Sequence, residues 1–267
     1  MTKGRVSRHH VEHVMGMAIS MDFRDPVRQK VIDEIVHWFH EVDATYSTYK
    51  PESPISQYGL GRLSRAQLAP EINDVLELCE TMRRDSDGDF DPWSVPAPNG
   101  SRFDPSGIVK GWAVECAAEM LESHDCANFC INAGGDIVVR GTKELGVPWR
   151  IGLRHPYSPR SFAKVVELSG RVGIATSATY ERAGHIINPN TGQPSGAIAS
   201  ATVIGPSLTF ADAFATTVFV KGNDGLQWLQ RQHPEYDGFI ISQDQTLATE
   251  GFFERVAAGG GQGAVAS

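Results

Sequence analysis

Apolar residues recur at helical spacing after a clear helix-start signal near residue 25. The inward face of this first helix is expected to carry Val27, Val31, Ile35, Phe39 and Val42. Because residues three or four positions apart share one face of a helix, the segment predicts an amphipathic helix packed on a core. Asp25 is expected as its N-cap and Pro26 as its first helical residue, which are positions that these residue types favour.

Four further segments have helical character. Pro70 opens the second helix, and its apolar stripe is expected to be Ile72, Val75, Leu76, Cys79 and Met82. A third helix is expected over about residues 112–121 and a fourth around Asp212. A short fifth helix is expected from Asp224 or Gly225 to residue 232.

Strand-like runs dominate the second half of the chain. Several of them alternate apolar and polar residues and are bounded by turn residues, a pattern typical of strands. The expected strands cover residues 129–131, 136–140, 149–153, 164–168, 199–204 and 238–242. A helix-rich first half followed by a strand-rich second half predicts an α+β fold. With no internal repeat and no dividing linker, we expect one domain over residues 15–256, between a flexible N-terminus (1–14) and a flexible, glycine-rich tail (257–267).

Composition sets broad limits on function. The chain has 267 residues, of which 41% are hydrophobic and 21% charged, as in globular proteins. Its net charge of −8 argues against general affinity for nucleic acid, which requires a basic face. A membrane-spanning helix requires about 18 consecutive apolar residues, and no stretch of the sequence comes near that length.

The cysteines and the N-terminal residues bear on the expected compartment. The 4 cysteines show no Cys-x-x-Cys spacing, so we expect reduced, mostly buried thiols and neither a zinc site nor a disulfide framework. Residues 1–14 contain no apolar core of a signal peptide. A cytoplasmic location is therefore expected, with a trimmed exported form as the alternative.

Asp212 and Thr216 form the most informative pair of polar residues. They lie four residues apart on the expected fourth helix, so their side chains share one face, one turn apart. The residues between them are small or apolar. A hard cation such as Mg²⁺ takes oxygen ligands, often only one or two from side chains. The structural alternative is that Asp212 caps or solvates the helix start and Thr216 bonds back to a carbonyl.

Residues 104–111, Asp-Pro-Ser-Gly-Ile-Val-Lys-Gly, come just before the expected third helix. A glycine-containing turn at a helix N-terminus offers backbone N–H donors to an anion, and Lys110 adds a positive charge. The spacing is not that of a Walker phosphate-binding loop. The alternative is an ordinary turn into a helix with a solvated lysine.

Three other segments have two interpretations each. Gly134 and Gly135, before Asp136, indicate either a tight hairpin turn or a close approach of a ligand to the backbone. Residues 87–93 contain three acids and two aromatic residues, which could contact a heterocycle and its ribose or form an acidic surface turn. His185, before an Asn-Pro-Asn-Thr-Gly turn, is either a general base or a structural histidine.

The order of these motifs along the chain is more specific than any one of them. They are Met15-Gly16, residues 46–49 (Tyr-Ser-Thr-Tyr), 89–92 (Asp-Phe-Asp-Pro), 104–111, 134–136, Thr176-Ser177, 185–189 (His-Ile-Ile-Asn-Pro) and 212–216 (Asp-Ala-Phe-Ala-Thr). In this order the chain resembles the FAD:protein FMN transferase family, the ApbE-like proteins, over about residues 15 to 251. The resemblance implies an α+β, T-fold-related fold in which two interleaved α/β modules enclose a cleft for FAD.

The resemblance also implies a metal site at the pyrophosphate of FAD. Mg²⁺ is the expected ion and Mn²⁺ is possible, since hard oxygen ligands suit both. Asp212 and Thr216 correspond to side-chain ligands of the metal, and Gly107 and Ala215 to residues that offer backbone carbonyl oxygens.

Residues that contact FAD are implied in the same way. Met15 and Tyr49 correspond to residues that pack on the rings, and His185 to the histidine that assists attack on the phosphorus. The remaining residues of the implied flavin-nucleotide site are Asp89, Phe90, Asp91, Asp104, Lys110, Gly134, Gly135 and Asp136.

The activity implied by the resemblance is Mg²⁺-dependent transfer of FMN from FAD onto a threonine or serine hydroxyl of a target flavoprotein, with release of AMP. His185 and Asp212 are the expected catalytic residues. The alternatives are an FAD pyrophosphatase that yields FMN and AMP, and a flavin-binding protein without turnover. The chain departs from the family pattern at Met17, where a threonine is usual, and at Ala178-Thr179, where Gly-Asp is usual.

Overall fold

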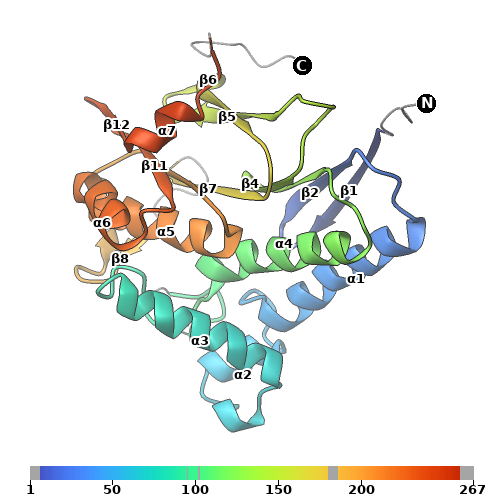
Figure 1. Ribbon diagram of the computed structural model, residues 1–267. Coiled ribbons are helices and arrows are strands. Elements are labelled where there is room, and N and C mark those ends of the chain that lie inside the picture. The colour runs from blue at the N-terminus through green and yellow to red at the C-terminus, as the bar shows by residue number, and fades with distance from the viewer. Residues whose placement is uncertain (1–6, 95, 102, 180–185, 259–267) are drawn as a thin grey trace.

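The computed structural model describes residues 7–94, 96–101, 103–179 and 186–258. Its centre is an eight-stranded sheet in which every neighbouring pair is antiparallel, in the order β1-β2-β3-β4-β7-β10-β11-β12 (Figure 1). These strands are β1 (Arg8–Val14), β2 (Met17–Phe23), β3 (Phe129–Ala133), β4 (Asp136–Arg140), β7 (Val172–Ala178), β10 (Ser200–Gly205), β11 (Asp237–Ile241) and β12 (Thr246–Ala248). Two separate hairpins pair β5 (Trp149–His155) with β6 (Ser158–Leu168) and β8 (Ile187–Asn188) with β9 (Gln193–Pro194).

In each half of the sheet, the helices come between the second and third strands in the order of the sequence. The first half contains α1 (Gln29–Tyr46), α2 (Pro54–Gly59), η1 (Arg65–Gln67), α3 (Pro70–Asp85) and α4 (Ser106–Ser123). The second half contains α5 (Leu208–Lys221), η2 (Gly222–Asp224) and α6 (Gly225–Gln232), and the short α7 (Glu250–Glu254) follows β12. The halves meet where β4 pairs with β7, so one topology occurs twice although the sequence shows no repeat. This arrangement confirms the expected mixture of helices and sheet.

Both faces of the sheet are covered, which explains why its central strands β4, β7 and β10 are buried almost without interruption. On β4, Val138 packs in the core shared with α1, α4 and α5, whereas Ile137 and Val139 pack in a second core with the β5–β6 hairpin and α7. Figure 1 shows α4 and α5 along one face and α7 with the β5–β6 hairpin along the other. In the described part of the chain, no helix combines the length and apolarity needed to cross a membrane.

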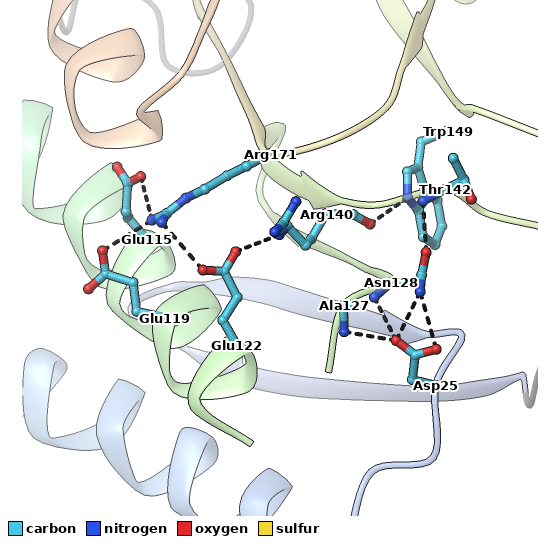
Figure 2. Close-up of polar contacts among 10 residues, drawn as sticks. All are labelled: Asp25, Glu115, Glu119, Glu122, Ala127, Asn128, Arg140, Thr142, Trp149 and Arg171. Carbon is cyan, nitrogen blue, oxygen red and sulfur yellow. Dashed lines mark hydrogen bonds and ion pairs between the residues drawn. The ribbon is translucent and has the colours of Figure 1, made fainter. Parts of the chain in front are cut away.

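The predicted helical faces are largely confirmed, and the predicted start of the first helix is wrong. The stripe on α3 is buried as expected, and so are Val31, Ile35, Phe39 and Val42 on α1. However, α1 begins at Gln29, and Asp25 is not its N-cap. Figure 2 shows the reason: the Asp25 carboxylate accepts hydrogen bonds from the backbone N–H groups of Ala127 (2.8 Å) and Asn128 (2.7 Å), just before β3.

The structure corrects two other expectations from the sequence. Residues Arg8–Val14, expected to be flexible, form β1 and pair with β2 along their whole length. They are the outer strand of the sheet and stay partly exposed, which explains their polar composition. The third helix begins at Ser106, six residues before Trp112, so that Gly107 and Lys110 lie within α4 and not in a turn before it.

Candidate functional site

A cavity of about 1040 Å³ opens where the two halves of the sheet meet, and most of the predicted site residues line it. Its volume is at the upper end of the range for small-molecule sites. The predicted residues on its wall are Met15, Tyr49, Asp89, Phe90, Asp91, Asp104, Gly107, Lys110, Gly134, Gly135, Asp212 and Thr216. Asp136 and Ala215 lie behind the wall, fully buried. His185 lies outside the described residues.

Asp212 and Thr216 occupy the cavity-facing side of α5, as their spacing predicts. Asp212 is 4% exposed, and its Oδ2 accepts a hydrogen bond of 3.1 Å from the backbone N–H of Gly111 on α4. The hydroxyl of Thr216 lies 3.1 Å from that of Ser177 on β7. A buried carboxylate in the second turn of α5 neither caps nor solvates the helix start, so that interpretation of Asp212 is wrong.

The first turn of α4 faces the same pair. A Cβ atom at Gly107 would lie 3.0 Å from Cε2 of Phe90 and 3.9 Å from the Thr216 hydroxyl oxygen. Glycine therefore lets the N-terminus of α4 approach α5 closely. Asp104, just before α4, accepts a hydrogen bond of 2.9 Å from the backbone N–H of Ser106 and so orders the helix start.

Lys110 places a positive charge at the wall of the cavity, and the buried carboxylate of Asp136 pairs with it. The Lys110 ammonium lies 2.5 Å from Oδ2 of Asp136, whose other oxygen accepts a hydrogen bond of 3.3 Å from the backbone N–H of Thr176. Asp136 therefore fixes the lysine side chain. The interpretation of Lys110 as a solvated residue after a turn is wrong, because its side chain is only 22% exposed and is paired.

Two tight turns form another part of the wall. Met15-Gly16 joins β1 to β2 and Gly134-Gly135 joins β3 to β4, and all four residues have positive φ, at 56°, 73°, 63° and 108°. The glycine pair is a hairpin turn, as one interpretation holds, and it also lines the cavity, while the close approach of a ligand to its backbone stays a prediction. Tyr49 also lines the cavity and is 63% exposed.

The acidic segment around Asp89 is ordered by contacts within the protein. The Asp89 carboxylate accepts hydrogen bonds from the Lys221 ammonium (2.6 Å) and the Asn190 side-chain amide (2.7 Å). These bonds connect the segment to the end of α5 and to the β8–β9 turn. Asp91 accepts a hydrogen bond of 2.9 Å from the backbone N–H of Trp93. The segment is thus a turn, as the structural alternative proposes, and at the same time a wall of the cavity.

Some residues of the wall were not assigned from the sequence. Ser177 and Thr176 belong to the motif series, but only their place beside Thr216 and Asp136 shows what they contact. Residues 151–154 of β5 also line the cavity, and no local motif indicates them.

Tyr46, on α1, lines the cavity as well. Burial raises the pKa of its phenol above the ordinary value, and its hydroxyl donates a hydrogen bond of 3.2 Å to the carbonyl of Glu71.

The donor set in the cavity restricts the kind of metal it can hold. Among the described residues no group of three or more His, Cys, Asp or Glu side chains gathers as a metal site. Asp212 supplies a buried carboxylate beside the hydroxyls of Thr216 and Ser177, and the less buried Asp43, Asp89, Asp91 and Asp104 line other parts of the cavity. Few side-chain oxygens suit an ion that takes its other ligands from phosphate and water, as Mg²⁺ does.

Comparison with known proteins agrees with the order of the motifs. A sequence model described as the ApbE family matches residues 15–99 and 95–240. The FAD:protein FMN transferase of Vibrio cholerae is 37% identical over 131 residues, which cover 45% of this chain and 39% of that protein. The one from Klebsiella pneumoniae is 31% identical over 156 residues, which cover 55% of this chain and 44% of that protein. The chain thus spans about two fifths of the length of these curated relatives.

Solved structures show the same fold. The flavin transferase ApbE from Vibrio cholerae superposes with a TM-score of 0.82 at 23% identity, covering 94% of this chain and 99% of that chain. The apo flavinyl transferase ApbE of Pseudomonas stutzeri superposes with a TM-score of 0.82 at 21% identity, covering 96% and 100%. At this level of identity the likeness concerns the fold alone, and it confirms the expected fold class.

Proposed function

The chain belongs to the ApbE family, and on that premise we propose that it is a Mg²⁺-dependent FAD:protein FMN transferase. In the proposed reaction a threonine or serine hydroxyl of a target flavoprotein attacks the phosphorus on the FMN side of the pyrophosphate. A phosphoester bond to the protein forms, the bond to the other phosphate breaks, and AMP leaves. Mn²⁺ is an alternative ion, because the same oxygen ligands suit it.

One observation supports this function most directly: a buried carboxylate, a hydroxyl and an ammonium face one cavity large enough for a dinucleotide. Asp212 and Thr216 would hold the metal through their side chains and Gly107 through its carbonyl oxygen. The carbonyl oxygen of Ala215 is the fourth proposed ligand, although Ala215 does not itself line the cavity. The fit is good because Gly107 has no side chain between Phe90 and Thr216. When bound, the metal would neutralise the charge of the pyrophosphate.

The other residues of the wall would bind and orient the dinucleotide. Lys110, fixed by Asp136, would contact a phosphate oxygen, and the first backbone N–H groups of α4 would add donors at its N-terminus. Met15 and Tyr49 would pack on the rings of FAD, beside the Gly134-Gly135 turn. Transfer of this kind depends mainly on placement of the reacting groups and on charge stabilisation.

His185 would accept the proton of the attacking hydroxyl. Histidine is a common general base near neutral pH, so this side chain could take the proton and release it to solvent after transfer. Replacing His185 with alanine is expected to lower the rate of FMN transfer by about 100-fold or more, the usual contribution of a general base. Binding of FAD, which the same side chain is expected to contact, should change much less than the rate of transfer.

The test is incubation of the protein with FAD, Mg²⁺ and a candidate acceptor flavoprotein. AMP is measured by chromatography, and protein-bound FMN by mass spectrometry. We expect both products from the wild type and neither from Asp212→Ala, while Asp244→Ala, in the exposed β11–β12 turn, matches the wild type. Free FMN without an adduct would identify a pyrophosphatase, and intact FAD would identify a binding protein; either result overturns the proposal.

A further inference from the structure

The Glu115 carboxylate lies buried where α4, α5 and the start of β7 meet, outside the cavity wall. Glu115 is 8% exposed. Its Oε2 accepts three hydrogen bonds from the N-terminus of α5: from the Ser207 hydroxyl (2.5 Å), the Thr209 backbone N–H (2.9 Å) and the Thr209 hydroxyl (2.9 Å). Its Oε1 accepts a hydrogen bond of 3.2 Å from Arg171, as Figure 2 shows.

The three elements that this carboxylate joins are those that supply the polar groups of the cavity. Lys110 comes from α4, Asp212 from α5 and Ser177 from β7. Thr209 precedes Asp212 by three residues, which corresponds to about 4.5 Å along a helix axis. A change in how α5 is held at Thr209 is therefore transmitted to Asp212 within a single turn.

The packing beside Glu115 leaves little room for α5 to move. A Cβ atom at Gly111 would lie 2.7 Å from the Leu208 carbonyl oxygen, and one at Gly173 would lie 2.5 Å from the Leu208 backbone nitrogen. The first residue of α5 is thus held between α4 and β7. Packing fixes the distances between these elements, and the hydrogen bonds of Glu115 fix how the first turn of α5 is oriented.

Charge at this junction favours the observed arrangement. A carboxylate at a helix N-terminus interacts favourably with the helix dipole and with its free N–H groups. Arg171 balances the charge of Glu115 and also pairs with Glu119 (3.1 Å) and Glu122 (3.4 Å) on α4. Glu119 pairs with the same arginine as Glu115, but the Glu119 side chain is 59% exposed. Within the described part of the chain, Glu119 forms an ion pair only with Arg171.

We infer that Glu115 is a positioning residue for the metal and pyrophosphate site. It holds the first turn of α5 against α4 and β7, so that the Asp212 carboxylate meets the metal in the correct orientation. This inference rests on the proposed function. It predicts that loss of Glu115 weakens metal binding although Glu115 does not touch the cavity.

The experiment measures binding of Mn²⁺ by electron paramagnetic resonance in the presence of FAD, together with the midpoint of thermal unfolding. We expect Glu115→Ala to raise the Kd for Mn²⁺ by roughly 10-fold to 100-fold, as for other residues that orient metal ligands. Glu115→Gln should restore much of the affinity, because an amide oxygen still accepts from Thr209. Glu119→Ala, the matched control on the same arginine, should bind like the wild type.

The outcomes separate this inference from the proposed function. If the wild type binds Mn²⁺ with FAD and Asp212→Ala does not, but Glu115→Ala and Glu115→Gln bind as tightly as the wild type, Glu115 has no positioning role. If Glu115→Ala fails to fold, Glu115→Gln decides the question. A Mn²⁺ affinity weaker than that of the wild type supports the positioning role, and an equal affinity overturns it. A wild type that binds no Mn²⁺ would overturn the proposed function and this inference with it.

Discussion

The Lys110 ammonium and the Asp136 carboxylate form an ion pair of 2.5 Å across the edge of the cavity, between α4 and β4. Asp136 is 1% exposed, and its two oxygens contact the Lys110 ammonium and the Thr176 N–H. The pair therefore has two roles. It stabilises the packing of α4 on the sheet, and it directs a cation toward the position proposed for the phosphates of FAD.

Replacing Asp136 with asparagine is expected to lower the free energy of unfolding by about 2–4 kcal/mol, since it removes the buried carboxylate that pairs with the Lys110 ammonium. Urea unfolding measures the change. The control is Asp43→Asn, which breaks the more exposed pair of Asp43 with Lys50 and should cost at most about 1 kcal/mol. Equal costs for the two variants would contradict a structural role for the buried pair.

Replacing Gly111 with alanine should disturb both stability and metal binding. The added Cβ would lie 2.7 Å from the Leu208 carbonyl oxygen and 3.0 Å from Cβ of Asp212, so α4 and α5 must separate. Overpacking of this kind costs about 1–3 kcal/mol, which thermal unfolding would detect. Gly196→Ala serves as the control because nothing lies within 4 Å of its Cβ position. A native unfolding midpoint for Gly111→Ala would show that the helices adjust freely.

Asp25 provides a test of the corrected helix start. If it capped α1, serine would replace it well, because serine is as good an N-cap residue as aspartate. The structure instead has the carboxylate accept from Ala127 and from both the backbone and side-chain nitrogens of Asn128. We expect Asp25→Ser to lose about 1–2 kcal/mol of stability in denaturant unfolding, close to the loss for Asp25→Ala. Full retention of stability in the serine variant would favour the capping role.

The cysteines are expected to be unreactive in the native protein. Burial raises the thiol pKa from its usual 9.0 to about 12 for Cys79, Cys116 and Cys130, and to about 11 for Cys126. A thiol-specific reagent at pH 8 should therefore modify them only after unfolding. Rapid modification of native Cys79 or Cys126, the two fully buried thiols, would contradict the burial seen here.

The same shifts set a pH dependence for stability. Above pH 9 the thiols of the unfolded chain ionise while those of the native chain keep their protons. Stability from these groups is thus fully present below pH 9 and is lost as the pH rises toward 12. Urea unfolding at a series of pH values measures whether the free energy of unfolding falls over this range. If the native thiols ionised like those of the unfolded chain, they would contribute no such fall.

Periodicity predicted those elements whose burial is decided within a single segment. The stripe of α3, from Ile72 to Met82, is buried because each apolar residue in it faces the same core. By contrast, β1 borders the sheet and exposes much of its length, so its polar sequence gave no strand signal. Gly107 and Gly111 resembled residues of a loop, but they lie in α4. These helix positions are occupied by glycine because neighbouring elements fill the space of a side chain.

Pairs of residues distant in the sequence account for what local patterns could not predict. The spacing of Asp212 and Thr216 showed that they share a face of α5, and the structure confirms that this face lines the cavity. Nothing near Asp25 indicates that it binds the segment before β3, about a hundred residues away. Nor does the sequence around Glu115 indicate that its partners are Ser207 and Thr209, because only the crossing of α4 and α5 brings them together.

The twofold occurrence of one topology also bears on how the chain tolerates a break. The loop from β4 to β5 carries Leu145, 84% exposed, at the junction of the two halves. Cleavage there would leave Lys110 on one fragment and Asp212 on the other, joined by the pairing of β4 with β7 and by the contact of α4 with α5. Neither fragment alone contains the whole cavity wall, so a split form of the protein would regain its pocket only by reassociation of both pieces.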